Sequence, residues 1–259
     1  MLRTLIFIFF FTSFCLKAQL TTNNKSPTDL VQNILVGKGV TVSNVTYTGN
    51  LSAIGGFNGS QSNIGFSEGI ILSTGSVFNA IGPNNNSGAT TDYKDVPDAE
   101  TAGDVDLDNL STNNTVDAIV LEFDFIPQGD TVEFQYIFAS EEYEYFEFSV
   151  YNDVFAFFIS GPGISGGVQN LAVVPGTSSP ITISNINKST NSSLYNFNGN
   201  GVSGPQFTDP KVVQFNGFTV PLTAISKVTP CKTYHLKIAI ADVFDGNFDS
   251  GVFLKGGSL

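Results

Sequence analysis

Hydrophobic and polar residues alternate along several short segments of the chain, the pattern that is typical of half-buried β-strands. In residues 131–138, Val132, Phe134 and Tyr136 share one face, whereas polar side chains occupy the other. Residues 119–125 alternate in the same way. Because the turn-forming residues 127–130, PQGD, separate the two segments, we predict that these strands pair as a hairpin.

Residues 154–159, VFAFFI, are almost wholly apolar, as expected for a strand that is covered on both faces. One helix is predicted, because Ser26 can cap its N-terminus, Pro27 suits its first turn and Gly37 can end it. The many short strands predict an all-β fold, a jelly-roll-like β-sandwich with this one short N-terminal helix. The predicted core includes Phe134, Tyr136, Phe155, Phe157 and Tyr234.

The first eighteen residues have the features of a secretory signal peptide, with Arg3 ahead of an apolar run and a junction after Ala18. We therefore predict that residues 1–18 are removed and that residues 19–259 form a single exported domain. No later apolar run approaches the roughly 20 residues that a membrane-spanning helix needs. Lipid attachment at Cys15 is disfavoured, because Phe14 stands where a small residue is expected.

The charge balance limits the partners of the chain. Its 11 basic and 23 acidic residues give a formal net charge of −12, and loss of Arg3 and Lys17 with the signal peptide lowers it to −14. Such a charge argues against nucleic acids and anionic lipid surfaces, whose binding depends on Lys and Arg. It favours cations. Cys231 would be the single cysteine of the mature chain, which excludes an internal disulfide.

Two acidic stretches follow strongly apolar strands and offer oxygen ligands for a cation. The predicted calcium ligands are Glu141, Glu142, Asn152, Asp153, Asp242, Asp245 and Asp249, with Glu142, Asp153 and Asp242 foremost. Ca²⁺ takes six to eight oxygens, which loops distant in sequence can supply together. The alternative is that the sequence Asp245-Gly246-Asn247 only forms a tight turn. Both interpretations stay open at this point.

A third acidic stretch, residues 104–109 (DVDLDN), opens like a calcium-binding EF-hand loop. The glycine position holds Asn109, and the twelfth position, which needs a bidentate Glu, holds Thr115. The pattern thus fails at its most informative position. These carboxylates are predicted to start a helix or a turn.

Catalytic signatures are scarce. His235 is the single histidine, and it alternates out of phase with the apolar side chains of its segment, which predicts a surface position on a strand. The chain contains no nucleophile elbow, phosphate-binding loop, zinc spacing or dinucleotide fingerprint. A pair of carboxylates that cleaves glycosidic bonds is the one enzymatic scheme that the composition permits.

Four motifs carry a resemblance to a known family. They are FASEEY, NDVFAFFISGPG, NLAVVPGT and YHLKIAIADVFDGNFDSGVFLKGGS, in this order along the chain. Together they resemble the choice-of-anchor L domain of bacterial secreted proteins, over roughly residues 27–259. The resemblance implies an extracellular β-rich domain, and a sorting or anchoring part after Leu259.

These observations predict a non-catalytic module of a secreted or cell-surface protein. It would serve adhesion or recognise a glycan or an extracellular protein, with calcium stabilising its loops. The alternatives are a secreted carbohydrate-active enzyme that uses paired carboxylates and a structural spacer domain. Exposed aromatic side chains would favour recognition, whereas a cleft with two carboxylates about 5 to 10 Å apart would favour hydrolysis.

Overall fold

A computed structural model describes residues 19–37, 39–90 and 102–259 of the chain. The predicted signal peptide lies outside the described residues. Within the described part, no helix has the length and apolar character needed to cross a membrane.

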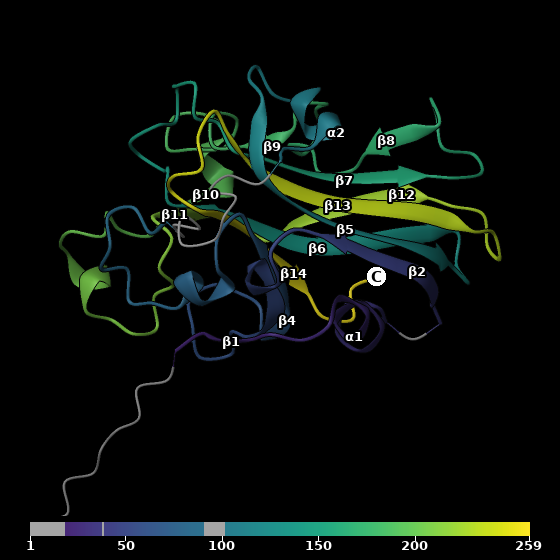
Figure 1. Cartoon of the computed structure of the whole chain (residues 1–259), viewed down its shortest axis with the longest axis horizontal. Coiled ribbons are helices and arrows are strands. Elements are labelled where there is room, and N and C mark those ends of the chain that lie inside the picture. Colours follow the sequence, from purple (N-terminus) through teal and green to yellow (C-terminus); the bar gives the residue numbers. More distant parts are fainter. Residues whose placement is uncertain (1–18, 38, 91–101) are drawn as a thin grey trace, which may run out of the picture.

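Two antiparallel sheets pack face to face and form the body of the molecule (Figure 1). The eight-stranded sheet contains β1 (Thr21–Asn23), β3 (Ile54–Asn58), β4 (Glu68–Ser73), β14 (Ser250–Lys255), β6 (Thr131–Ser140), β11 (Gly217–Thr219) and β10 (Tyr195–Phe197), in this order, with β12 (Leu222–Lys227) also paired to β6. The six-stranded sheet contains β2 (Thr41–Thr48), β5 (Thr115–Ile126), β13 (Tyr234–Val243), β7 (Val154–Ser160) and β8 (Val168–Asn170), in this order, with β9 (Ile181–Thr182) also paired to β7. The predicted all-β sandwich is therefore confirmed, while its jelly-roll connectivity stays a prediction.

Aromatic side chains from both sheets meet in the main core. The rings of Phe134 on β6 and Phe157 on β7 stack with centroids 5.2 Å apart, and Tyr136 lies 5.4 Å from Phe155. These four side chains and Tyr234 are buried, which confirms the predicted core. Burial of aromatic surface on this scale is the main source of stability in such a sandwich.

The outer face of the six-stranded sheet is also partly covered. Leu107 of the single-turn helix α2 (Val105–Asp108) packs with Val154 and Ala156 of β7 and with Ala239 of β13. This contact explains why residues 154–159 are apolar at nearly every position. A strand with a cover on each face has no side that must be polar.

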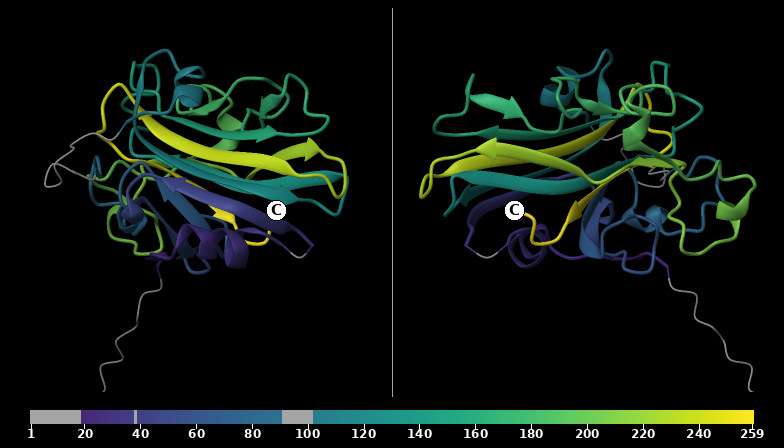
Figure 2. Two further views of the ribbon diagram at one scale, coloured as in Figure 1. Left: turned by 45° about the vertical axis from the view of Figure 1, so that its right-hand side comes forward. Right: turned by 180° about the vertical axis from the view of Figure 1, so that it is seen from behind.

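The predicted N-terminal helix is present as α1 (Pro27–Leu30), which continues as a π-helical turn over Val31–Leu35. The Ser26 hydroxyl accepts a hydrogen bond from the Asp29 backbone N–H at 3.2 Å, as the capping pattern predicts. Leu30, Val31 and Leu35 are buried in the main core. The helix contacts β2 of one sheet and β3 of the other, so it closes one edge of the sandwich (Figure 2).

Short 3₁₀ turns complete the helical structure. They span Leu51–Ala53, Val77–Ala80, Ser192–Leu194 and Pro205–Phe207.

The predicted hairpin of residues 119–125 with residues 131–138 is wrong. These segments form β5 and β6, which lie in different sheets. β5 pairs with β2 and β13, whereas β6 pairs with β14, β11 and β12. An alternating pattern shows only that one face of a strand is buried. Two strands in facing sheets bury one face each, as two neighbouring strands of one sheet do, so the pattern does not distinguish the two arrangements.

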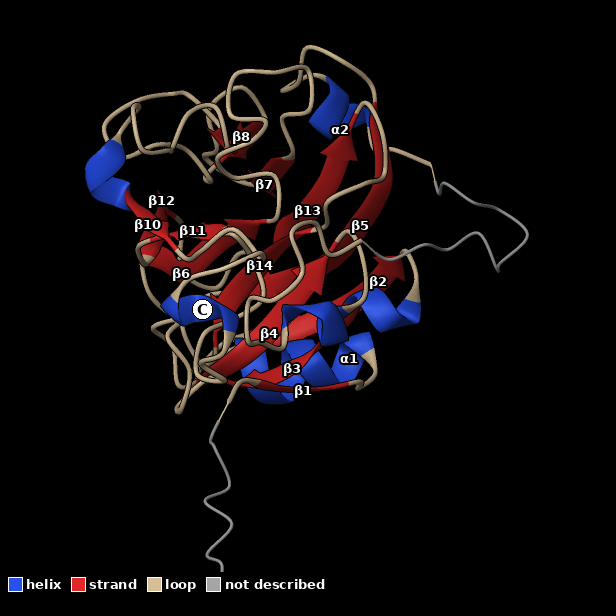
Figure 3. Cartoon of the chain, turned by 90° about the vertical axis from the view of Figure 1, so that its left-hand side faces the viewer, coloured by secondary structure: helices blue, strands red, loops and turns tan. Residues whose placement is uncertain are grey.

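Two connections cross between the sheets at the same end of the sandwich, the end that faces the viewer in Figure 3. Residues 141–153 connect β6 to β7, and residues 244–249 connect β13 to β14. Val154 pairs with Ala241, so Asp153 and Asp242 come next to each other. Ser140 pairs with Ser250, which places Glu141 beside Asp249. The strand register therefore gathers the two acidic stretches in one place.

Candidate metal centre

Five carboxylates are buried where the two connections meet. The exposed fractions of Glu141, Glu142, Asp153, Asp242 and Asp249 lie between 0% and 2%. Asp and Glu are almost never fully buried unless a partner compensates the charge. This cluster therefore requires a physical explanation beyond packing.

Asp153 holds the centre of the cluster between two strands. Its Oδ1 accepts a hydrogen bond from the Val243 backbone N–H at 3.1 Å, and its Oδ2 accepts one from the Ser250 hydroxyl at 2.6 Å. Burial raises the pKa of Asp153 to about 7, although these bonds and a hydrogen bond with Asp242 oppose the rise. Asp153 thus links β13 to β14 through its side chain.

Glu142 and Asp242 flank Asp153, and each has an oxygen without a partner. Glu142 Oε2 and Asp242 Oδ1 are buried and form no hydrogen bond. Burial raises the pKa of both carboxyls, and the neighbouring Asp153 charge raises it further. A hydrogen bond from Thr74 to Asp242 only partly offsets these effects. Each unpartnered oxygen costs free energy, since water no longer solvates it.

Glu141 and Asp249 form the second half of the cluster. The Glu141 backbone N–H donates to the Asp249 carbonyl at 3.1 Å, and Glu141 Oε1 accepts from Gln214 Nε2 at 3.0 Å. Asp249 Oδ2 accepts from Asn79 Nδ2 at 3.0 Å. The Asp249 carboxylate also packs directly on the backbone of Gly75, where a Cβ atom would collide with it. The site thus extends from β4 through β14 to the loop before β11.

Two predicted ligands point to other partners. Asn152 Oδ1 accepts a hydrogen bond from the Ser184 backbone N–H at 3.0 Å. Asp245 Oδ1 accepts from the Asn247 backbone N–H at 3.2 Å, the bond that the alternative turn interpretation expects. The Asp245 charge still contributes to the raised pKa of Glu142, so this carboxylate lies at the rim of the cluster.

Among the described residues, no basic side chain neutralises the inner carboxylates. Glu141, Glu142, Asp153 and Asp242 form no ion pair with any Lys, Arg or His in the described part of the chain. Over the same residues, no three Asp, Glu, His or Cys side chains already stand in an arrangement that could hold a metal ion. The site is a set of buried oxygen donors that would have to turn toward a shared centre. Oxygen donors of this kind suit hard cations such as Ca²⁺.

Sequence reasoning missed several residues of this site. Thr74, Gly75 and Asn79 follow β4, and Ser250 opens β14. The signal that could have found them is the polar run Ser73-Thr74-Gly75 directly after an apolar strand. The partners of Glu141 gave no local signal, because Gln214 lies 73 positions away in the sequence.

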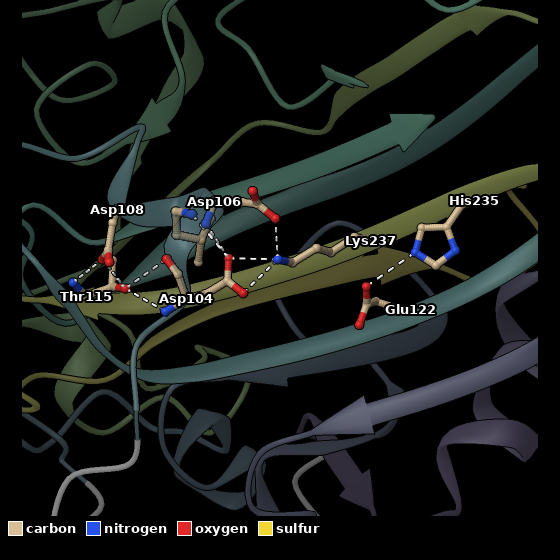
Figure 4. A network of polar contacts seen from close by, with 8 residues as sticks. Asp104, Asp106, Asp108, Thr115, Glu122, His235 and Lys237 are labelled. Carbon is tan, nitrogen blue, oxygen red and sulfur yellow. Dashed lines mark hydrogen bonds and ion pairs between the residues drawn. The ribbon is translucent and has the colours of Figure 1, made fainter. Parts of the chain in front are cut away.

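The carboxylates of the EF-hand-like stretch, residues 104–109, bind other side chains and backbone groups of the chain (Figure 4). Asp104 caps α2 and also receives Lys237 Nζ at 2.7 Å, while Asp106 receives the same ammonium group at 2.6 Å. Asp108 accepts hydrogen bonds from the Thr115 backbone N–H and hydroxyl, both at 2.7 Å. The prediction that these carboxylates start a helix is confirmed, and a lysine supplies the positive charge.

His235 lies on the outer face of β13, as predicted for a surface position. Its Nδ1 is 2.8 Å from Asp124 Oδ1, and its Nε2 is 3.3 Å from Glu122 Oε1 (Figure 4 shows the second contact). Asn44 also donates to Asp124, and this bond together with the one from His235 lowers the pKa of Asp124. The histidine therefore takes part in cross-strand contacts between β13, β5 and β2.

Comparison with known proteins identifies the family. No curated protein and no solved structure is significantly similar to the chain. The family model of the choice-of-anchor L domain, in contrast, matches residues 19–259, which include every strand and both connections of the acidic cluster. The chain therefore belongs to the choice-of-anchor L domain family.

Proposed function

We propose that this domain is a non-catalytic recognition module that serves adhesion or binds a glycan or protein partner, and that calcium stabilises the two connections at one end of its sandwich. Membership of the family implies a surface or secreted protein. Function within that class has to be argued from the site, because a fold alone does not specify it.

The unpartnered oxygens of Glu142 and Asp242 within a cluster of buried carboxylates carry the proposal. Uncompensated buried carboxylates repel one another and destabilise the fold, whereas a divalent cation makes the same groups mutually attractive. Glu142, Asp153 and Asp242 would be the first ligands, with Asp249 as the next. Their side chains would have to turn to bring oxygens within about 2.3 to 2.6 Å of the ion.

A cation held in this way would connect elements of both sheets. Glu142 and Asp153 belong to the β6–β7 connection, while Asp242 and Asp249 belong to β13 and the connection that follows it. Calcium supplies charge neutralisation and coordination bonds when it is bound. The chain itself supplies the orientation, through the bonds of Asp153 to Val243 and Ser250.

Burial argues against the enzymatic alternative. The carboxylates of this cluster are at most 2% exposed, so a glycoside substrate has no access to them without a large rearrangement. Two carboxylates that cleave a glycosidic bond must flank the substrate in an open cleft. This observation favours a stabilising role for the cluster over a catalytic one.

Thermal unfolding in excess calcium and in chelator tests the proposal. A ligand at a hundred times its Kd stabilises the folded state by about 2.7 kcal/mol, which raises the Tm of a domain this size by roughly 5 to 10 °C. Asp242→Asn should remove most of that gain. Asp106→Asn is the matched control and should keep it, because Asp106 pairs with Lys237 on the outer face. Equal Tm values of the native domain in both media would reject the calcium site.

A further inference from the structure

Exposed aromatic side chains gather on the same two connections that carry the acidic cluster. The exposed fractions are 53% for Tyr145, 71% for Phe148 and 57% for Phe244. Val150 on the same connection is also exposed, whereas Leu51, Val168 and Ile225 are exposed on separate elements. Contiguous exposed apolar surface commonly marks an interaction site, whereas scattered single residues need no explanation.

Ring contacts join the two connections into one aromatic patch, which we define as Tyr145, Phe146, Tyr151, Phe244 and Phe248. Ring centroids lie 6.4 Å apart for Tyr145 and Phe146 and 5.3 Å apart for Phe146 and Tyr151. Contacts across the two connections are 5.3 Å for Tyr151 with Phe244 and 5.1 Å for Phe146 with Phe248. The rings of the patch are therefore in contact across both connections, and Tyr145 and Phe244 are its exposed members.

Two of these rings belong to residues whose backbone conformation is unfavourable. Phe244 and Phe248 have φ angles of 83° and 63°, in the left-handed region that bulky residues rarely adopt. Such a conformation is unfavourable and persists where the surroundings enforce it. Hydrogen bonds from the Phe248 N–H to Thr90 and from the Phe244 N–H to the Asn114 carbonyl supply part of that enforcement. Phe244 gains little burial in return, so core packing does not explain its position.

The surroundings of the patch are acidic. Residues 141–153 and 244–249 contain seven Asp and Glu residues and no Lys or Arg. Glu144 and Asp245 are the partly exposed members of this set, and Lys188 reaches Glu144 Oε1 from outside these connections at 3.4 Å. This ion pair shows that the rim accommodates a basic side chain beside Glu144.

We propose that the aromatic patch binds a positively charged segment of an extracellular partner protein, with arginine or lysine side chains over its rings and beside the acidic rim. Aromatic faces attract cations, arginine most effectively, and nearby carboxylates add charge complementarity. A neutral glycan would use the rings but not the acidic rim, and an anionic surface would be repelled by it. The proposal rests on the proposed function, because calcium would hold both connections in the geometry that forms the patch.

A peptide-binding assay tests this inference on the secreted form of the chain. The probe is a fluorescent peptide of alternating arginine and glycine, compared with a matched glutamate–glycine peptide and with neutral oligosaccharides of glucose and N-acetylglucosamine. The variant with Tyr145→Ser and Phe244→Asn removes two exposed rings without changing net charge, and Asn tolerates the left-handed conformation at position 244. Phe197→Ser, at an exposed ring on β10, is the control variant.

The expected result is saturable binding of the arginine peptide that weakens roughly tenfold in the double variant and is unchanged in Phe197→Ser. Equal binding by the double variant, at an unchanged Tm, would overturn the inference, because acidity alone would then explain the affinity. Patch-dependent binding of an oligosaccharide in place of the peptide would overturn it in favour of a glycan partner. If the peptide binds equally well in calcium and in chelator, the aromatic patch is the binding site but calcium is not needed to form it. If calcium raises the Tm but the peptide does not bind, the inference about the aromatic patch is wrong and the proposed calcium site is unaffected.

Discussion

The stability of the domain in chelator should fall as pH rises, and Asp153 makes one part of the effect that can be measured by its substitution. Burial raises the pKa of this carboxyl from 3.8 to about 7. A raised folded-state pKa for an acid contributes stability that is fully present below the unfolded pKa and is lost as pH rises through the folded pKa. A rise of this size corresponds to about 4 kcal/mol, lost between about pH 4 and pH 7.

Urea unfolding at a series of pH values in chelator measures this loss. Between pH 5 and pH 8 the free energy of unfolding should decrease by about 3 kcal/mol from Asp153 alone, at about 1.4 kcal/mol per pH unit. Glu142, whose pKa burial raises to about 10, adds to the decrease in this range and extends it to higher pH. Asp153→Asn should make the decrease between pH 5 and pH 8 smaller by the Asp153 share, and Glu142 and Asp242 should maintain the remaining slope. A free energy of unfolding that stays constant or rises from pH 5 to pH 8 would refute the assignment of a buried, uncompensated carboxyl.

Three substitutions test other parts of the account. Phe134→Ala should cost about 3 to 5 kcal/mol in urea unfolding, because its ring stacks on a partner in the core, and an unchanged midpoint would contradict its burial. Gly75→Ala should displace the Asp249 carboxylate and reduce the calcium-dependent rise in Tm, so an unaltered rise would separate Asp249 from the site. Lys237→Met should lower the free energy of unfolding by about 1 to 3 kcal/mol by leaving Asp104 without its ammonium partner, yet leave the calcium response intact. Loss of that response would move the cation site to the outer face.

Local patterns in the sequence predicted the strands and the core but not the arrangement of the sheets. Alternation identified Phe134 and Tyr136 as inward, because the period of two in a strand depends only on its own residues. The pairing of β5 and β6 was wrong because the choice between two facing sheets depends on contacts far along the chain. β5 pairs with β13 and β6 pairs with β14, and no local pattern encodes these pairings.

The same distinction applies to the candidate site. Its acidic residues stand out in the sequence, since carboxylates are depleted in and beside apolar strands. Their hydrogen-bond partners do not stand out: Ser250 and Thr74 are common residue types, and their role follows from the meeting of β14 with β4. The aromatic patch was equally hidden, because Phe244 and Tyr151 come together only through the fold.

A calorimetric titration of residues 19–259 with calcium tests the central claim most directly. The account predicts saturable binding of calcium at one site per chain, which Asp242→Asn abolishes and Asp106→Asn leaves unchanged. Both substitutions replace one carboxyl group by an amide of the same shape, so a difference between them reports the position of the ion and not the overall acidity. The absence of saturable binding to the native chain, or equal binding by the two variants, would contradict the claim that the buried carboxylates at this end of the sandwich form a calcium site.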